Sequence, residues 1–136
     1  MHSLLQARAL FEQGVQQVES GLWAQAESSF AQALALAPDR PSVLMNLGVV
    51  RAALGRPTQA IELLSRAVEL EPESFESWGH LGAVYAESGQ FRASLKALDR
   101  ALSLQPQALL PLRHKASVLR ELERWHESAE CLEELH

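Results

Sequence analysis

The residues that could support chemistry are few, and their spacing does not assemble a reaction centre. Cys131 is the single cysteine, and the histidines nearest to it are His126 and His136. A cysteine nucleophile needs a base within hydrogen-bonding reach. Cys131 and its two neighbouring histidines instead belong to a segment with the pattern of an ordinary amphipathic helix. The chain also lacks a GxSxG motif and a glycine-rich phosphate loop, because its glycines stand singly. The sequence therefore predicts no catalytic residue and a protein that is not an enzyme.

Two histidines come closest to a metal-binding pattern. His80 and His114 are separated by 34 residues, which is the repeat period of the chain. A shared metal would need further ligands, and only Glu76, Glu87 or Glu121 could supply them. No CxxC or HExxH spacing occurs. We therefore predict no metal and no cofactor, and interpret both histidines as part of a polar wall.

Composition and charge favour a helical protein and exclude several classes. Apolar residues make up 47% of the 136 residues, and alanine, leucine, glutamine and glutamate recur throughout. The formal net charge is -5 without a long basic run, which argues against nucleic-acid binding. No apolar stretch approaches the roughly 20 residues that span a bilayer, and the N-terminus lacks a signal-peptide pattern. With one cysteine, the chain fits a cytoplasmic protein that binds neither nucleic acid nor membrane.

A period of 34 residues organises the chain. Pro38, Pro72 and Pro106 each close the phrase Ala-apolar-x-Leu-x-Pro, and each lies 34 residues from the next. Glycines keep the same step in two series, namely Gly14, Gly48 and Gly82, and Gly21, Gly55 and Gly89. Proline ends a helix, and glycine is favoured where the chain turns through a left-handed residue. The punctuation therefore predicts repeated helix–turn–helix segments.

One stretch of the chain carries a family resemblance. The segment Trp78-Gly-His-Leu81-Gly82-Ala-Val-Tyr85, followed by Leu98, Ala101 and Pro106, resembles the tetratricopeptide pattern nearly in full. In that register the repeats cover 7–40, 41–74, 75–108 and 109–136, the last one truncated, and they form a single tetratricopeptide domain over 1–136. The resemblance implies an all-α fold, a right-handed superhelical solenoid of antiparallel helix pairs, with seven or eight helices and no strands.

Repeated small and large residues predict how the two helices of a pair pack. The small residues Gly14, Gly48, Gly82 and Ala116 are expected to let the helices approach closely, opposite the small residues Ala26, Ala60, Ser94 and Ser128. Core positions repeat as Leu10, Leu44, Trp78 and Leu112 on the first helices and as Phe30, Leu64, Leu98 and Leu132 on the second. Departures fall mainly in the end repeats. Arg51 is the internal exception, and its aliphatic stem could still pack.

The resemblance implies that function lies on a concave wall built from the first helix of each repeat. The wall residues predicted to bind a partner are Phe11, Val15, Met45, Asn46, Val49, His80, Ala83, Arg113 and His114, and Glu76, Gly79 and Leu110 lie on the same wall. The first two repeats contribute an apolar patch, and the last contributes a basic end. A bacterial scaffold that binds a peptide or protein segment with apolar anchors and an acidic flank would suit this wall.

Other functions compete with this interpretation. The family's chaperone-tail clamp would place lysine, asparagine and arginine at the positions of Phe11, Val15, Asn46, Glu76 and His80, of which only Asn46 fits. The runner-up function is the N-terminal tetratricopeptide segment of a larger bacterial enzyme, glycosyltransferase-like or methyltransferase-like, that recruits a substrate or partner. An RNA-binding helical repeat is disfavoured because the wall is not basic.

The last repeat predicts an exposed apolar end. Its second helix would carry Leu132 and Leu135, with Trp125 just before it, and no following helix covers them. Solenoids without a polar cap tend to pair or to be poorly soluble. We therefore predict either a homodimer through the last repeat or a native chain that continues beyond His136 and covers this face.

Overall fold

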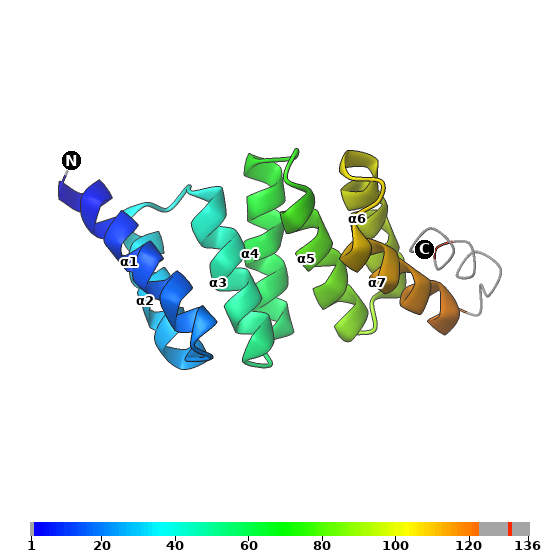
Figure 1. Cartoon of the computed structure of the whole chain (residues 1–136), viewed down its shortest axis with the longest axis horizontal. Helices are drawn as coiled ribbons and strands as arrows, with labels where there is room; N and C mark the ends of the chain where they lie inside the picture. Colours follow the sequence, from blue (N-terminus) through cyan, green and yellow to red (C-terminus); the bar gives the residue numbers. More distant parts are fainter. Residues whose placement is uncertain (1, 123–130, 132–136) are drawn as a thin grey trace. The chain divides into compact units, whose positions relative to one another are not determined.

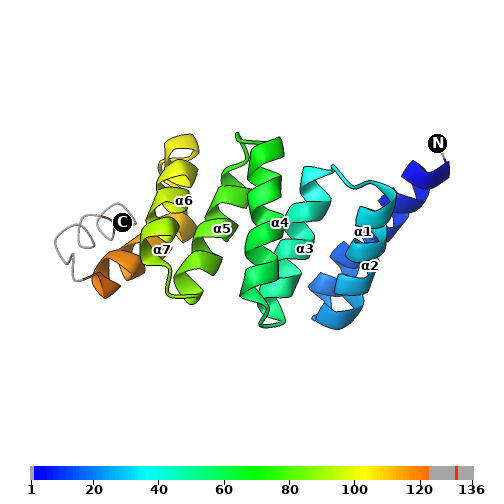
Figure 2. The ribbon, with the colours of Figure 1, turned by 180° about the vertical axis from the view of Figure 1, so that it is seen from behind.

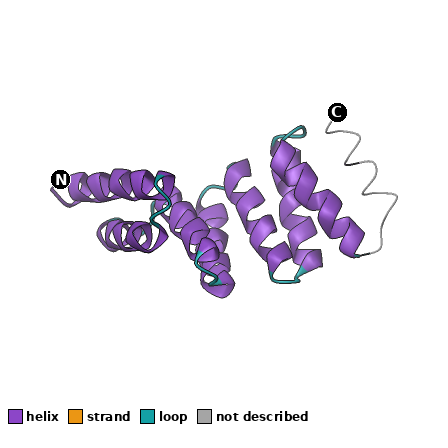
Figure 3. Cartoon of the chain, turned by 60° about the horizontal axis from the view of Figure 1, so that its bottom comes forward, coloured by secondary structure: helices purple, strands orange, loops and turns teal. Residues whose placement is uncertain are grey.

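The computed structural model describes residues 2–122 and Cys131. Over these residues it forms seven α-helices and no strand (Figure 1 and Figure 3). The helices are α1 (His2–Glu19), α2 (Trp23–Leu36), α3 (Pro41–Ala53), α4 (Pro57–Leu70), α5 (Phe75–Glu87), α6 (Phe91–Leu104) and α7 (Leu109–Glu121). The predicted all-α fold class is thereby confirmed. The predicted apolar end, with Trp125, Leu132 and Leu135, lies outside the described residues.

The contacts between helices divide the chain into two compact units. The N-terminal unit covers Met1–Glu71 and holds α1 to α4, and the C-terminal unit covers Pro72–His136 and holds α5 to α7. In the first, α1 packs against α2, α3 against α4, and α2 against α3; in the second, α5 packs against α6, and both contact α7. Figure 1 and Figure 2 show these helix pairs side by side from opposite directions. Each complete pair corresponds to one predicted repeat, while a single domain over 1–136 stays a prediction.

Local sequence rules place the helix ends. Gly21, Gly55 and Gly89 adopt φ values of +74°, +78° and +76°, the left-handed region that glycine enters without steric cost. The residue after each glycine donates its backbone N–H to a carbonyl of the preceding helix, as Leu22 does to Gln17 at 2.8 Å. Prolines begin α3 and α4, where a missing N–H leaves no helix bond unmade. The left-handed turn predicted at these glycines is confirmed.

Gly55→Ala is expected to lower the free energy of unfolding by about 1 kcal/mol, because alanine must then adopt a left-handed conformation. A Cβ built on Gly55 meets no atom within 4 Å, so the loss comes from the backbone alone. Urea unfolding followed by circular dichroism measures the change. Gly55→Asn is the matched control, since asparagine tolerates this region better and should lose less. An equal loss in both variants would contradict the backbone explanation.

Each helix pair closes over a glycine on its first helix. A Cβ added to Gly14, Gly48 or Gly82 would lie 2.6, 2.9 or 2.6 Å from the nearest atom of Phe30, Leu64 or Leu98, in that order. These three large side chains are fully buried. The predicted close approach is confirmed. The large residue lies nearest above each glycine, and at Gly48 the carbonyl oxygen of the small residue Ala60 would also lie 3.3 Å from an added Cβ. Of the small residues, Ser94 donates its hydroxyl to the Gly82 carbonyl at 2.7 Å.

Two polar residues that break the repeat pattern have polar partners on α2. Nε of Arg51 on α3 lies 3.3 Å from Oε2 of Glu27, and Arg56 pairs with the same carboxylate. Gln17, which occupies the position of Arg51 in the first repeat, accepts a hydrogen bond from Ser29 Oγ at 2.7 Å. Each polar departure is therefore compensated by a polar residue on a packed helix, and Arg51 links α2 to α3.

Glu27→Ala is expected to cost about 1 kcal/mol of stability, at the upper end for surface ion pairs, because it leaves two arginines without their shared carboxylate. The Glu27 side chain is only 21% exposed, so water screens it less than an ordinary surface group. Asp39→Ala is the matched control, since Asp39 is 80% exposed in its pair with Arg66. Thermal unfolding in low salt and in about 1 M salt measures both variants. A cost for Asp39→Ala as large as that for Glu27→Ala would overturn this assignment.

Candidate functional site

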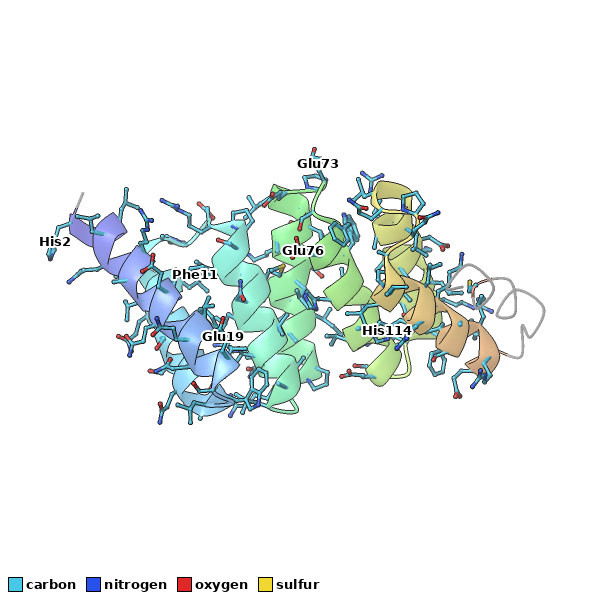
Figure 4. All side chains as sticks on the ribbon, viewed as in Figure 1. His2, Phe11, Glu19, Glu73, Glu76 and His114 are labelled. Carbon is cyan, nitrogen blue, oxygen red and sulfur yellow. The ribbon has the colours of Figure 1, made fainter. Side chains whose placement is uncertain are left out.

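The predicted wall residues of the N-terminal unit lie on the first helices of its two pairs. They are Phe11 and Val15 on α1 and Met45, Asn46 and Val49 on α3, and all are half-buried. Phe11, Val15 and Met45 pack against the core of this unit. The Phe11 ring, labelled in Figure 4, lies with its centroid 5.6 Å from that of the buried Phe30. These three side chains therefore support the core with one side and offer only their remaining surface to a partner.

Asn46 is held by its own helix. Its Nδ2 donates a hydrogen bond to the carbonyl of Ser42, one turn earlier on α3, at 2.7 Å. An asparagine carboxamide also carries a second N–H and an oxygen that accepts. No residue of the described part pairs with that oxygen through a hydrogen bond. Asn46 is thus oriented along α3 with hydrogen-bonding capacity left for the backbone of a ligand.

A groove of about 350 Å³ opens between the N-terminal half of α1 and the start of α3. It is lined by Leu4, Leu5, Ala7, Arg8, Phe11, Ala37, Arg40, Ser42 and Val43, and we call it the α1–α3 groove. Leu4 and Leu5 are 48% and 66% exposed. They lie in a turn of α1 that precedes the first repeat, so the repeat register, which starts at residue 7, missed them. The signal that could have found them is an adjacent apolar pair continuing the helix upstream of that register.

The predicted wall residues of the C-terminal unit lie on α5 and α7. His80 and Ala83 on α5 and His114 on α7 are half-buried, whereas Arg113 on α7 is exposed. Burial lowers the pKa of His80 below its ordinary value, with Glu76 opposing and His114 adding to the shift. The two histidines therefore lie near enough to interact electrostatically. His80 is neutral near pH 7 and can both donate and accept a hydrogen bond.

A smaller hollow of about 210 Å³ lies between α5 and α7, and we call it the α5–α7 notch. It is lined by Phe75, Glu76, Gly79, His80, Leu110 and Pro111. Leu110 is 65% exposed, the surface of a large apolar side chain left open to solvent. In Figure 4, Glu76 lies near the start of α5, and His114 lies further along on α7. Glu76, Gly79, His80 and Leu110 all occupy predicted wall positions, whereas Phe75 and Pro111 were not predicted.

The described residues hold little else that could carry out chemistry. Within them, no three histidine, cysteine or acidic side chains gather as a metal would require. Cys131 is buried in an apolar cluster with Leu95, Leu98 and Leu119, where a thiol acts as a small apolar side chain. None of the described helices combines the length and apolar character that crossing a bilayer requires. The nine predicted residues thus form two sets, five on α1 and α3 and four on α5 and α7.

Comparisons with known proteins agree with this architecture. MamA 41-end from Desulfovibrio magneticus RS-1 is 20% identical, with a TM-score of 0.87 over 93% of this chain and 71% of that chain. The first TPR of Spaghetti (RPAP3), bound to HSP90 peptide SRMEEVD, is 18% identical, with a TM-score of 0.85 over 88% and 95% of the two chains. YrrB, described as a TPR protein with an unusual peptide-binding site, is 23% identical, with a TM-score of 0.84 over 94% and 66%.

The sequence comparisons address the family directly. No curated protein sequence matches the chain significantly. Two family models, both described as tetratricopeptide repeat, match residues 11–75 and 51–116. The matched residues include the left-handed glycines of all three complete helix pairs and the glycine contacts inside those pairs. The chain therefore belongs to the tetratricopeptide repeat family.

Proposed function

We propose that this protein is an interaction scaffold that binds a peptide or protein segment along its first helices, with an apolar anchor in the α1–α3 groove. The observation that carries the proposal is the exposure of Leu4 and Leu5 beside a groove of about 350 Å³. Ligand pockets typically measure about 300–1,000 Å³. Apolar side chains that stay exposed around such a hollow commonly mark a binding surface.

The charge beside the groove favours a carboxylate next to the apolar anchor. Arg8 and Arg40 both line the groove. Arg8 already pairs with Glu12 at 3.3 Å, whereas Arg40 forms no ion pair with the described residues. An arginine binds a carboxylate through two parallel hydrogen bonds, which orients the ligand as well as attracting it. The ligand class is therefore a segment with an apolar anchor flanked by an acidic residue.

Proteins of similar fold support peptide binding as the activity. One of them is bound to HSP90 peptide SRMEEVD, and another has an unusual peptide-binding site. This chain lacks the basic residues of the chaperone-tail clamp, with Phe11 and Val15 at two of the clamp positions, so we expect a different peptide sequence. We propose no catalytic activity and no nucleic-acid or membrane partner for this protein, and we expect it in the cytoplasm.

Selection of random peptides displayed on phage, with the 136-residue chain as bait, tests the proposal. Enriched peptides are synthesised, and their dissociation constants are measured by calorimetry. We expect enrichment of apolar residues next to aspartate or glutamate, and loss of affinity when Arg40 is replaced by glutamine. Failure to enrich any peptide over an unrelated helical protein would refute the scaffold function. Peptides that bind equally well when Arg40 is replaced by glutamine would refute the acidic flank but not the scaffold function.

A further inference from the structure

The α5–α7 notch exists because one repeat lacks a side chain at a wall position where the others carry one. This position holds Phe11, Met45, Gly79 and Arg113 in the four repeats. At Gly79 the wall is bare, and the hollow of about 210 Å³ opens there. A Cβ built on Gly79 would lie 3.5 Å from Cγ of Pro111, an ordinary van der Waals contact. Close helix packing therefore does not require glycine here, unlike at Gly82, and the hollow is left for another occupant.

The walls of the notch are apolar on two sides and negative on a third. Phe75 on α5 and Leu110 on α7 supply apolar surface, and Leu110 is 65% exposed. Glu76 is exposed and forms no ion pair with any described residue. His80 is mostly neutral near pH 7, because burial lowers its pKa, with Glu76 opposing the shift and His114 adding to it. The side chains that line the notch therefore carry one net negative charge.

The neighbouring basic residues do not neutralise this charge within the notch. Arg113 and His114 lie one turn further along α7 and are not among its lining residues. Lys115 pairs with Asp99 on α6 at 2.8 Å. Figure 4 shows a second acidic residue, Glu73, in the loop just before α5, the helix that carries Glu76. A cation entering the notch would thus meet an available carboxylate.

The backbone that carries Glu76 is held in place. Glu76 lies in the first turn of α5, where the helix dipole stabilises a negative charge. Ser74 caps this turn by accepting the N–H of Ser77 at 3.3 Å. Nε1 of Trp78 donates to the carbonyl of Pro72 at 2.8 Å, which ties the preceding loop to the helix. Little backbone and loop freedom therefore remains to be lost when a ligand pairs with Glu76.

We propose that the α5–α7 notch binds a lysine or arginine side chain of the partner segment, with the alkyl stem against Phe75 and Leu110 and the cation on the Glu76 carboxylate. Long basic side chains bury their stems on apolar surface while the charged head stays at a polar edge. A glutamate side chain would be repelled by Glu76, and a purely apolar one would leave that carboxylate unpaired. The proposal rests on the scaffold function and adds to it a second anchor of different chemistry, a basic side chain bound on the C-terminal unit.

Titrations of the isotope-labelled 136-residue chain, followed by nuclear magnetic resonance, test this notch without knowledge of the natural partner. The probes are capped alanine pentapeptides whose central residue is lysine, arginine, norleucine or glutamate. We expect saturable shifts of the Gly79 amide with the lysine and arginine peptides, at affinities at least about fivefold above that of norleucine. Added salt should reduce the preference, because it screens the ion pair at this exposed carboxylate.

Variants separate the two parts of the notch. Glu76→Gln keeps the shape of the side chain and should bring the lysine and arginine peptides to the affinity of norleucine. Gly79→Met fills the hollow and should remove the shifts with every probe, followed in this variant at the amide of the lining residue His80, while the spectrum stays that of a folded chain. Glu87→Gln on α5 is the matched control, because Glu87 is exposed and does not line the notch, and it should not weaken binding of the basic peptides.

The outcomes distinguish this inference from the scaffold function. Equal affinity of the norleucine or glutamate peptide, or no change in Glu76→Gln, would overturn the assignment of the notch to a basic side chain. Phage-selected peptides that bind normally to Gly79→Met would limit the failure to the notch and leave the scaffold function standing. If no selected peptide exists but the basic probes still bind at Gly79, the scaffold function with its α1–α3 anchor is refuted and the assignment of the notch to a basic side chain stands.

Discussion

Gly82→Leu is expected to destabilise the C-terminal unit by about 3 kcal/mol, the upper end for a side chain forced into a packed core. A Cβ at Gly82 would already lie 2.6 Å from both Cγ and Cδ2 of Leu98, and 3.3 Å from the Leu98 backbone nitrogen. Leu98 is fully buried and cannot swing into solvent. Helices α5 and α6 would have to separate, which also breaks the hydrogen bond from Ser94 to the Gly82 carbonyl. Urea unfolding monitored by circular dichroism measures the loss.

Two alanine variants on α5 form a matched test of this steric role. Gly79→Ala should raise stability by about 0.5–1 kcal/mol, since alanine is the better helix former and its Cβ makes an ordinary contact. Gly82→Ala gains the same propensity but places its Cβ 2.6 Å from Leu98, so we expect a net loss. If both alanines stabilise the chain equally, the close contact at Gly82 does not constrain the α5–α6 pair.

Leu4→Glu combined with Leu5→Glu is expected to weaken binding of a phage-selected peptide at least about 100-fold. Each leucine contributes roughly 1.5 kcal/mol when its exposed surface is buried by an apolar anchor, which is about tenfold in the dissociation constant. The two side chains are 48% and 66% exposed and line the α1–α3 groove. Calorimetry with the double variant measures the change, and helicity should be unaffected.

The surface of the chain offers controls of the same chemistry. Leu22 and Leu70 are 43% and 47% exposed and do not line the groove. Leu22→Glu with Leu70→Glu should leave peptide affinity within about twofold, which is a few tenths of a kcal/mol. Val49→Glu tests whether the predicted wall itself contributes to peptide affinity. Met45→Glu is less suitable for this test, because Met45 packs against the core. Full affinity in the Leu4 and Leu5 double variant would exclude the groove as the anchor site.

The helix pairs and their ends could be predicted from residue types and their spacing alone. A left-handed residue at Gly55 and a helix start at Pro41 are local backbone choices, which depend on the residue type and its immediate neighbours. The 34-residue step repeats these choices, so the period alone predicts helix number, length and family. The wall residues were predicted in the same way, because a helix position determines which face a side chain occupies.

What the side chains at those wall positions can bind depends on how the helices pack. In the sequence, Arg51 only departs from the repeat pattern. The packing of α2 against α3 places Glu27 beside it, and these two residues are far apart in sequence. Phe11 and Met45 lie where the register predicts, but the core takes part of their surface. The α1–α3 groove needs a turn of α1 that lies outside any repeat, and the α5–α7 notch needs a glycine on one helix facing Pro111 on another. Hollows, burial and ion pairs between helices depend on the distance between packed surfaces, which periodicity along a single chain does not specify.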